Sequence, residues 1–255
     1  MRLKIIFSNP EKQTEVPINY QRILQGVIYH LLETDQEFQH FIHEIGYAYE
    51  NRRFKAFTFS RLFGKSEFNP QRRSLTFKGP ITWYISSAIP KFIHLLGQSF
   101  LLRDQIRLHQ TDVTVKQLQY EQVAPIYSEK IRIKMLSPVT VYSTFVGDNG
   151  KKITQYFDPD DLAFSHLIEE NAKKKYEAFF KKPFEGQLKI KPLKVSPKDK
   201  VITKYKDTII NGWNGIYELE GPKDMLEFLY NTALGSKNSQ GFGMFGVLNK
   251  NENTN

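Results

Sequence analysis

The histidines of this sequence are its best candidates for proton transfer at cellular pH, because imidazole has a pKa of about 6.5. His40 and His43 lie three residues apart in an apolar stretch, and His30 directly follows Tyr29. A well-placed histidine can take a proton from an attacking group or return one to a leaving group. A histidine in an apolar helix is also often a partly buried structural residue, so the spacing alone leaves both interpretations open.

A glycine-rich segment near the C-terminus, residues 233–244, is the second feature suited to chemistry. Nine consecutive residues, 235–243, include three glycines, two serines, an asparagine and Lys237. Glycine permits positive φ and a close approach of the backbone, so such a loop can wrap a phosphate with its amides beside one cation. It is not a P-loop, because Gly-Lys-Ser/Thr is absent and a helix is expected before it. A simple connection between the last helix and the last strand is the alternative.

Positive charge is concentrated in two parts of the chain. The 255 residues carry a formal net charge of +9, and residues 171–206 alone hold twelve lysines against three acidic residues. A second cluster of lysines and arginines, within residues 52–73, contains a single acidic residue, Glu67. Such concentration favours a polyanionic partner, bound through phosphate contacts and counterion release. A lysine-rich solvated surface is the alternative.

The composition excludes several classes of protein. No run approaches the ~20 apolar residues of a membrane span, and no signal-peptide core follows Met1, so we expect a cytoplasmic protein without membrane contact. The chain has no cysteine, which excludes disulfides and thiolate metal sites. No cluster of His, Asp and Glu has metal-ligand spacing, so we expect no metal or cofactor. The acidic residues Asp158, Asp160 and Asp161 indicate a helix N-terminus instead.

Two similar series of elements must position these residues. In the first, Asn19 is expected to cap a helix from Tyr20 to Leu32, in which Gln25 and Tyr29 share one face. Asp35 is expected to begin a short helix that carries His43. The other predicted elements of this series are strands 3–7, 55–60, 74–78 and 81–86, one or two strands within 106–121, and a helix from residue 90 to 100.

The second series begins at residue 131 and repeats the same order. Its predicted elements are strand 131–135, helix 159–180 with Leu162 facing inward, strands 186–195, 201–206 and 212–220, helix 222–230 and strand 242–248. Both series follow the βαββαβ order of ferredoxin-like domains. We therefore predict an α+β protein of two tandem ferredoxin-like (RRM-like) domains. Their expected limits are 1–125 and 126–250, joined near 122–130 and followed by a tail at 251–255.

Three stretches together resemble one family of proteins. They are Leu24-Gln25-Gly26-Val27-Ile28-Tyr29, Phe41-Ile42-His43-Glu44 with Lys-Ala-Phe-Thr-Phe-Ser at 55–60, and the glycine-rich residues 235–244. In these stretches the sequence resembles the CRISPR-associated repeat-RNA-processing endoribonucleases, the Cas-six family, with agreeing order and spacing to about residue 247. The family's loop usually opens Gly-x-Gly. Ala233 stands at the first of these glycines, and alanine resists a left-handed backbone.

The resemblance implies a role in antiviral defense, as a metal-independent endoribonuclease that cuts CRISPR repeat transcripts into guide RNAs. Its products would carry 5′-hydroxyl and 2′,3′-cyclic phosphate ends. Tyr29, His43 and Lys55 occupy the positions of the family's catalytic trio. The RNA's own 2′-hydroxyl is the attacking group, so His43 would transfer protons with Tyr29 as its partner, and Lys55 would stabilise developing charge. Which of Tyr29 and His43 is the base stays open, and His30 and His40 are secondary candidates.

RNA-binding residues are expected in three groups. Lys237 in the glycine-rich loop would contact phosphate. Arg52 and Arg53 would hold the backbone that flanks the cut. Lysines that alternate along the predicted strand 186–195 would form a one-sided basic stripe. The full set is Arg52, Arg53, Lys189, Lys191, Lys194, Gly235, Lys237, Ser239, Gly241 and Gly243.

Two other functions fit the same sequence features. The first is a non-catalytic component that binds repeat RNA within a CRISPR effector complex. His43 argues against it, because non-catalytic relatives usually lack this histidine. The second is a basic ferredoxin-like scaffold protein without preference for repeat RNA. CRISPR repeat RNA is the expected partner, and the sequence leaves open whether the protein joins an effector complex or forms a homodimer.

Overall fold

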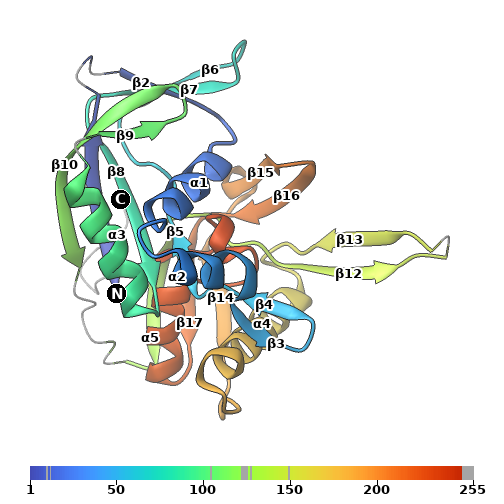
Figure 1. The fold of residues 1–255 in the computed structure, drawn as a ribbon. Helices are drawn as coiled ribbons and strands as arrows, with labels where there is room; N and C mark the ends of the chain where they lie inside the picture. Colours follow the sequence, from blue (N-terminus) through green and yellow to red (C-terminus); the bar gives the residue numbers. More distant parts are fainter. Residues whose placement is uncertain are drawn as a thin grey trace.

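The computed structural model describes residues 1–9, 11, 13–103, 105–121, 126, 128–148 and 150–248. Two antiparallel sheets of five and four strands, each associated with two long helices, form the body of the molecule (Figure 1). Four smaller sheets and hairpins are inserted between the elements of these two units. Within the described ranges, no helix combines the length and the apolar character needed to cross a membrane.

The first sheet has β1 at its centre and the strand order β5-β8-β1-β10-β9. Alternation along β1 turns Leu3, Ile5 and Phe7 to one face, where they are buried in a core shared with α1 and α3. All neighbouring strands are antiparallel. The elements of this unit are β1 (Arg2–Ser8), α1 (Gln21–Leu31), β5 (Phe57–Phe59), β8 (Ile81–Ser87), α3 (Pro90–Leu102), β9 (Gln105–Leu108) and β10 (Thr111–Glu121).

The second sheet is built in the same way, with the order β14-β17-β11-β18. Ile133 of β11 and Leu219 of β17 are buried against the apolar stripe of α4, which includes Phe164 and Ile168. The elements of this unit are β11 (Lys130–Met135), α4 (Leu162–Phe180), β14 (Lys189–Lys194), β17 (Ile216–Glu220), α5 (Lys223–Thr232) and β18 (Phe245–Leu248).

Both units place their four core strands in the same spatial order, second-third-first-fourth, with a helix after the first and the third strand. This arrangement confirms the predicted ferredoxin-like fold class. Residues 122–125 and 127, which include most of the predicted linker, lie outside the described residues, as do 249–255 with the predicted tail. The domain limits 1–125 and 126–250 therefore stay predictions.

Short hairpins and turns surround the two cores. The hairpin β12–β13 projects from the body (Figure 1), and the Tyr156 hydroxyl at its base donates a hydrogen bond of 2.9 Å to the Ile209 carbonyl of the neighbouring hairpin β15–β16. The inserted elements are β2 (Gln13–Pro17), α2 (Gln36–His40), the π-helical turn η1 (Phe41–Ile45), β3 (Tyr47–Tyr49), β4 (Arg52–Phe54), β6 (Ser66–Asn69), β7 (Ser74–Lys78), β12 (Tyr142–Val146), β13 (Lys152–Tyr156), η2 (Pro197–Asp199), β15 (Lys200–Tyr205), β16 (Thr208–Trp213) and η3 (Asn238–Gln240).

Arg2 joins the two units. It lies on the face of β1 opposite Leu3 and is buried. Its guanidinium carbon is 3.8 Å from the ring centroid of Tyr230, at the end of α5. It also donates hydrogen bonds to the carbonyls of Phe245, at 2.9 Å, and Tyr230, at 3.1 Å. The second face of the first sheet is therefore covered in part by the last helix and strand of the second unit.

Two local predictions are wrong, one because of a tertiary contact and one because of where a helix begins. Asn19 does not cap α1, whose N-cap is Tyr20 without a side-chain hydrogen bond. The Asn19 side chain instead accepts hydrogen bonds from the Thr203 hydroxyl, at 2.8 Å, and the Lys204 amide, at 3.3 Å, both in β15. Leu162 does not face inward: it is 97% exposed, because α4 begins at this residue, before the turns that contact the sheet.

The predicted strand 55–60 is also shorter than expected. Ala56 has a positive φ of 55°, which interrupts the extended backbone, so β5 begins at Phe57. Lys55 consequently lies in the connection between β4 and β5 rather than in a strand.

Candidate active site

Tyr29 and His43 are in direct contact. Their ring centroids are 4.4 Å apart, with the planes nearly perpendicular at 81°. Tyr29 projects from the third turn of α1, whereas His43 is presented by the π-helical turn 41–45. In that turn Ile42 is buried and anchors the backbone, which leaves the adjacent His43 side chain about half exposed.

Lys55 completes the cluster through the backbone of His43. Its ammonium donates a hydrogen bond of 2.7 Å to the His43 carbonyl. Burial and, secondarily, the neighbouring charge of Arg53 lower the pKa of Lys55, while Glu44 opposes this shift. The structure therefore brings together all three residues of the predicted catalytic trio.

The surroundings of Tyr29 and His43 favour particular positions for their protons. Burial is the main reason that the pKa of Tyr29 is raised, so its hydroxyl stays protonated at neutral pH and can donate a hydrogen bond. The Nδ1 atom of His43 contacts a carboxylate oxygen of Glu44. An ionised carboxylate only accepts hydrogen bonds, so this contact favours a proton on Nδ1 and leaves Nε2 for chemistry.

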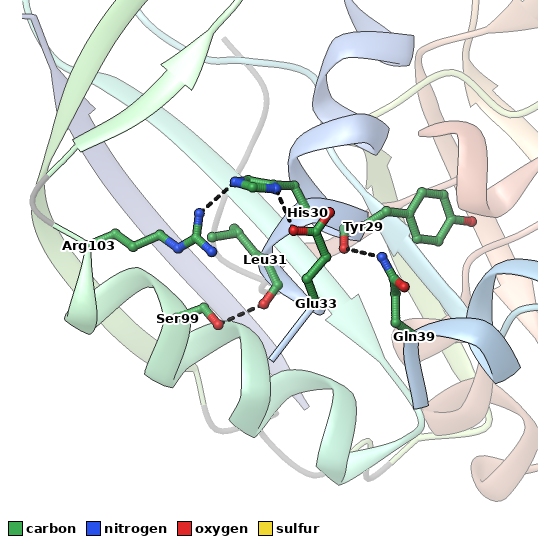
Figure 2. Close-up of polar contacts among 7 residues, drawn as sticks. All are labelled: Tyr29, His30, Leu31, Glu33, Gln39, Ser99 and Arg103. Atoms are coloured by element: carbon green, nitrogen blue, oxygen red, sulfur yellow. Dashed lines mark hydrogen bonds and ion pairs between the residues drawn. The ribbon is translucent and has the colours of Figure 1, made fainter. Parts of the chain in front are cut away.

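The two rival histidines lie elsewhere. Figure 2 shows His30 directed away from the Tyr29 ring, with its Nε2 2.6 Å from a guanidinium nitrogen of Arg103 and its Nδ1 2.9 Å from a carboxylate oxygen of Glu33. His40 is exposed at the end of α2 and lines neither of the grooves described below. In the same view, the Gln39 side chain donates to the Tyr29 carbonyl at 3.1 Å and fastens α2 to α1.

The trio lines a groove of about 340 Å³, which we call the trio groove. One wall comes from the hairpin β15–β16, which sequence reasoning did not place near the site. Gln25 connects three elements here: its side-chain amide donates to the Ser239 carbonyl at 2.6 Å, and its oxygen accepts from the Tyr205 hydroxyl. The lining residues are Gln25, Tyr29, His43, Lys55, Tyr205, Lys206, Thr208, Ile210, Lys237, Ser239 and Gln240.

The glycine-rich loop forms the edge between this groove and a second one of about 370 Å³, which we call the loop groove. Lys55, Lys237, Ser239 and Gln240 line both. The other residues lining the loop groove are Arg52, Arg53, Phe54, Ala56, Phe57, Tyr142, Asn171, Lys175, Thr232, Gly235, Ser236 and Asn238.

Tight backbone geometry shapes this loop. Gly243 has a φ of 80°, and a Cβ atom there would lie 1.9 Å from the Leu234 carbonyl oxygen, so only glycine fits. Ala233 also adopts a positive φ, 71° with ψ 169°, a region that is normally occupied by glycine. The loop thus opens with a glycine-like backbone although the residue is alanine.

The predicted RNA-binding residues outside β14 fall into two sets. Arg52, Arg53, Gly235, Lys237 and Ser239 line the loop groove, whereas Gly241 and Gly243 are buried within the loop and shape it. Burial lowers the pKa of Lys237, whose ammonium lies 5.0 Å from the ring centroid of Tyr142.

The basic stripe of β14 lies apart from both grooves. Lys189 pairs in register with Glu220, and Lys191 pairs with Glu218, so carboxylates of β17 flank these lysines. A register shift after Pro192 interrupts the spacing before Lys194. The structure does not bring the stripe to the trio, and its part in RNA binding stays a prediction.

Comparison with protein families gave two matches that together span most of the chain. Residues 119–247 match the family model described as "CRISPR associated protein Cas6, C-terminal". Residues 15–119 match "CRISPR-associated protein Cas6, N-terminal".

Curated relatives and solved structures agree with these matches. The sequence is 28% identical over 245 residues to "CRISPR-associated endoribonuclease Cas6 1" of Methanocaldococcus jannaschii, covering 94% of this chain and 90% of the relative. It is 22% identical over 253 residues to "CRISPR-associated endoribonuclease Cas6" of Pyrococcus furiosus, covering 96% and 88%. A solved "CRISPR associated protein Cas6" superposes with a TM-score of 0.78 at 25% identity, covering 98% of this chain and 99% of that one. A structure described as "An RAMP protein binding different RNA substrates" has a TM-score of 0.83 at 17% identity, covering 98% and 100%, and supports the fold.

Proposed function

The chain belongs to the Cas6 family of CRISPR-associated proteins, and from this premise we propose that it is an endoribonuclease that cuts CRISPR repeat transcripts into guide RNAs. The names of its curated relatives support endoribonuclease activity. The observation that carries the proposal is the contact of Tyr29, His43 and Lys55 in one groove, next to the glycine-rich loop.

The proposed reaction is an internal transesterification. The ribose 2′-oxygen forms a bond to the phosphorus while the bond from phosphorus to the 5′-oxygen breaks, which yields a 2′,3′-cyclic phosphate and a 5′-hydroxyl. The 2′-hydroxyl loses one proton and the leaving 5′-oxygen gains one. The nucleophile belongs to the RNA, so the reaction as proposed requires proton transfer and charge stabilisation from the protein, and no metal.

The surroundings of each side chain support a specific role. The open Nε2 of His43 takes the proton of the 2′-hydroxyl, with Glu44 stabilising the imidazolium that forms. Tyr29, which stays protonated, donates to the leaving oxygen or to the phosphate. Lys55 fixes the His43 turn through its carbonyl and places positive charge where the phosphorane becomes more negative.

The test uses RNA copied from the CRISPR repeat of the same genome, incubated with the protein in excess chelator. A matched substrate carries a 2′-deoxy nucleotide at the mapped cut. We expect cleavage of the first RNA only, with a cyclic phosphate end. Cleavage of the 2′-deoxy RNA would refute internal attack, and tight binding without any cleavage would assign the protein to the non-catalytic RNA-binding class.

Variants of two neighbouring histidines test the site. His43→Ala should lower the cleavage rate about 100-fold or more, since general acid–base catalysis contributes about 10²–10⁴-fold, while RNA affinity changes little. His40→Ala is the matched control and should cleave at the wild-type rate. Equal rates for His43→Ala and wild type would remove His43 from the mechanism. Membership of a larger effector complex and homodimer formation stay predictions.

A further inference from the structure

Lys175 differs from the two lysines that precede it in α4. Its neighbours Lys173 and Lys174 lie on the outer side of α4 and form ion pairs with Glu169 and Glu170, at 2.9 and 3.4 Å. Lys175 is only 2% exposed and points under the glycine-rich loop. Its ammonium donates hydrogen bonds of 2.7 Å to the Ala233 carbonyl and 2.7 Å to the Asn238 side-chain oxygen. A lysine carries three ammonium protons, and these bonds use two.

The charged groups around Lys175 offer it no counter-ion. Among the described residues that line the loop groove there are five cations, contributed by β4, the connection after it, α4 and the loop, and no carboxylate. On the packed helix α5, Asp224 accepts from the Tyr176 hydroxyl at 3.0 Å. Glu50 and Glu177 line a separate depression beside β3. Burial in these surroundings lowers the pKa of Lys175 to about 7.

A second buried polar residue lines the same groove, and one of its atoms has no hydrogen-bond partner among the described residues. Asn171 lies one turn before Lys175 on the same face of α4 and is 7% exposed. Its side-chain oxygen has no hydrogen-bond partner among the described residues. Buried polar atoms are rarely left unpaired, so this oxygen can accept one further hydrogen bond at the base of the groove.

We propose that one phosphodiester group of bound RNA sits in the loop groove over Lys175, and that Lys175 takes up a proton when the RNA binds. The inference rests on the proposed function, since it assumes an RNA ligand. The phosphate oxygens supply the negative charge that no carboxylate in the loop groove supplies to the ammonium. Arg52 and Lys237, which line the same groove, bind the same phosphate or a neighbouring one. RNA binding and protonation of Lys175 therefore favour each other.

The expected proton uptake and its effect on RNA affinity follow from the coupling between proton binding and RNA binding. An amine with a pKa of about 7 is about one-tenth protonated at pH 8, so RNA that binds the ammonium form draws in about 0.9 proton. The affinity for RNA should then fall up to about tenfold for each pH unit above 7, at constant salt.

The experiment is titration calorimetry at pH 8 and fixed salt, in two buffers with different ionisation enthalpies. The ligand is the repeat RNA with the 2′-deoxy cut site, so that cleavage does not contribute heat. The wild type should take up about 0.9 proton. The control Lys174→Met removes one positive charge from the adjacent, outer position of α4 and should take up the same number of protons as the wild type. Lys175→Met should bind RNA with almost no proton uptake.

A second variant covers a failure of Lys175→Met to fold. Lys175→Arg keeps a permanent charge and should bind RNA without proton uptake and without the pH dependence of the wild type. Uptake by Lys175→Met or Lys175→Arg equal to that of the wild type would overturn the inference. So would RNA binding by the wild type without uptake, which would leave the proposed nuclease function standing. A wild type that binds no repeat RNA would overturn both.

Discussion

Replacement of Gly243 by alanine should destabilise the protein strongly. Gly243 has a φ of 80°, and both of its backbone groups are used: its amide donates to the Pro138 carbonyl at 2.9 Å, and its carbonyl accepts from the Leu234 amide at 3.0 Å. An added Cβ would lie 1.9 Å from the Leu234 carbonyl oxygen. That oxygen also accepts a hydrogen bond of 2.9 Å from the Asn238 side chain. The loop must therefore shift, and at least one of these bonds must break.

Two contributions set the size of the effect. A left-handed backbone costs a non-glycine residue about 1–2 kcal/mol. A buried carbonyl left without its hydrogen bond costs about 1–3 kcal/mol more. The free energy of unfolding should fall by about 2–5 kcal/mol in total. For a chain of this size, each kcal/mol lowers the melting temperature by about 2–4 °C, so a decrease of about 4–20 °C is expected.

The matched control is Gly246→Ala. Gly246 lies three residues further along, in β18, where an added Cβ would meet nothing closer than 3.7 Å. This change should be neutral or stabilise by up to about 1 kcal/mol, because glycine is unfavourable in a strand. Thermal and urea unfolding of both variants measure the difference. A melting temperature for Gly243→Ala within about 2 °C of that for Gly246→Ala would refute the strain argument.

Two further predictions concern the loop residue Ala233 and Lys175, which donates hydrogen bonds to the loop from α4. Ala233→Gly should relieve about 1–3 kcal/mol of backbone strain, which offsets the cost of a freer unfolded chain and a lost methyl group. The control Ala172→Gly, buried in α4, should lower the free energy of unfolding by about 2 kcal/mol without such compensation. Equal losses for the two variants in urea unfolding would show that Ala233 is unstrained. Lys175 keeps its proton to about pH 10.5 when unfolded but only to about pH 7 when folded, so the unfolded chain binds more protons between these values and stability should rise with pH. From pH 7 to 9 the wild type should gain about 2–3 kcal/mol relative to Lys175→Met, and a constant difference would contradict the shift.

The repeating pattern of strands and helices could be predicted because it depends on the local spacing of apolar residues along the sequence. The strand at 74–78 and the helix beginning at Pro90 agree with β7 and α3, since alternation and a proline at a first turn are local signals. The prediction that Asn19 caps α1 was wrong because its hydrogen-bond partners in β15 are about 180 residues away, and no short-range sequence pattern indicates such a contact.

The site was predictable only in part, and from a different source. Tyr29, His43 and Lys55 came from a family resemblance, and the structure brings them together. The wall contributed by β15–β16 depends on how one unit packs against the other, which periodicity does not encode. Lys175 had a signal that went unused: it follows Ala172 by three residues and precedes Tyr176, so helical spacing places it on the inward face despite its charge.

The position of Arg2 has a consequence for the order in which the molecule assembles. Its partners, Tyr230 and Phe245, are separated from it by 228 and 243 residues, so the guanidinium stays hydrated until the second unit is in place. Desolvation of the cation is thereby deferred to the step in which the two halves dock. Ribosomal synthesis delivers Arg2 first and its carbonyl acceptors last, and domains generally fold as units in that order. We therefore expect closure of the interface, and with it completion of both grooves, to follow the folding of the two units.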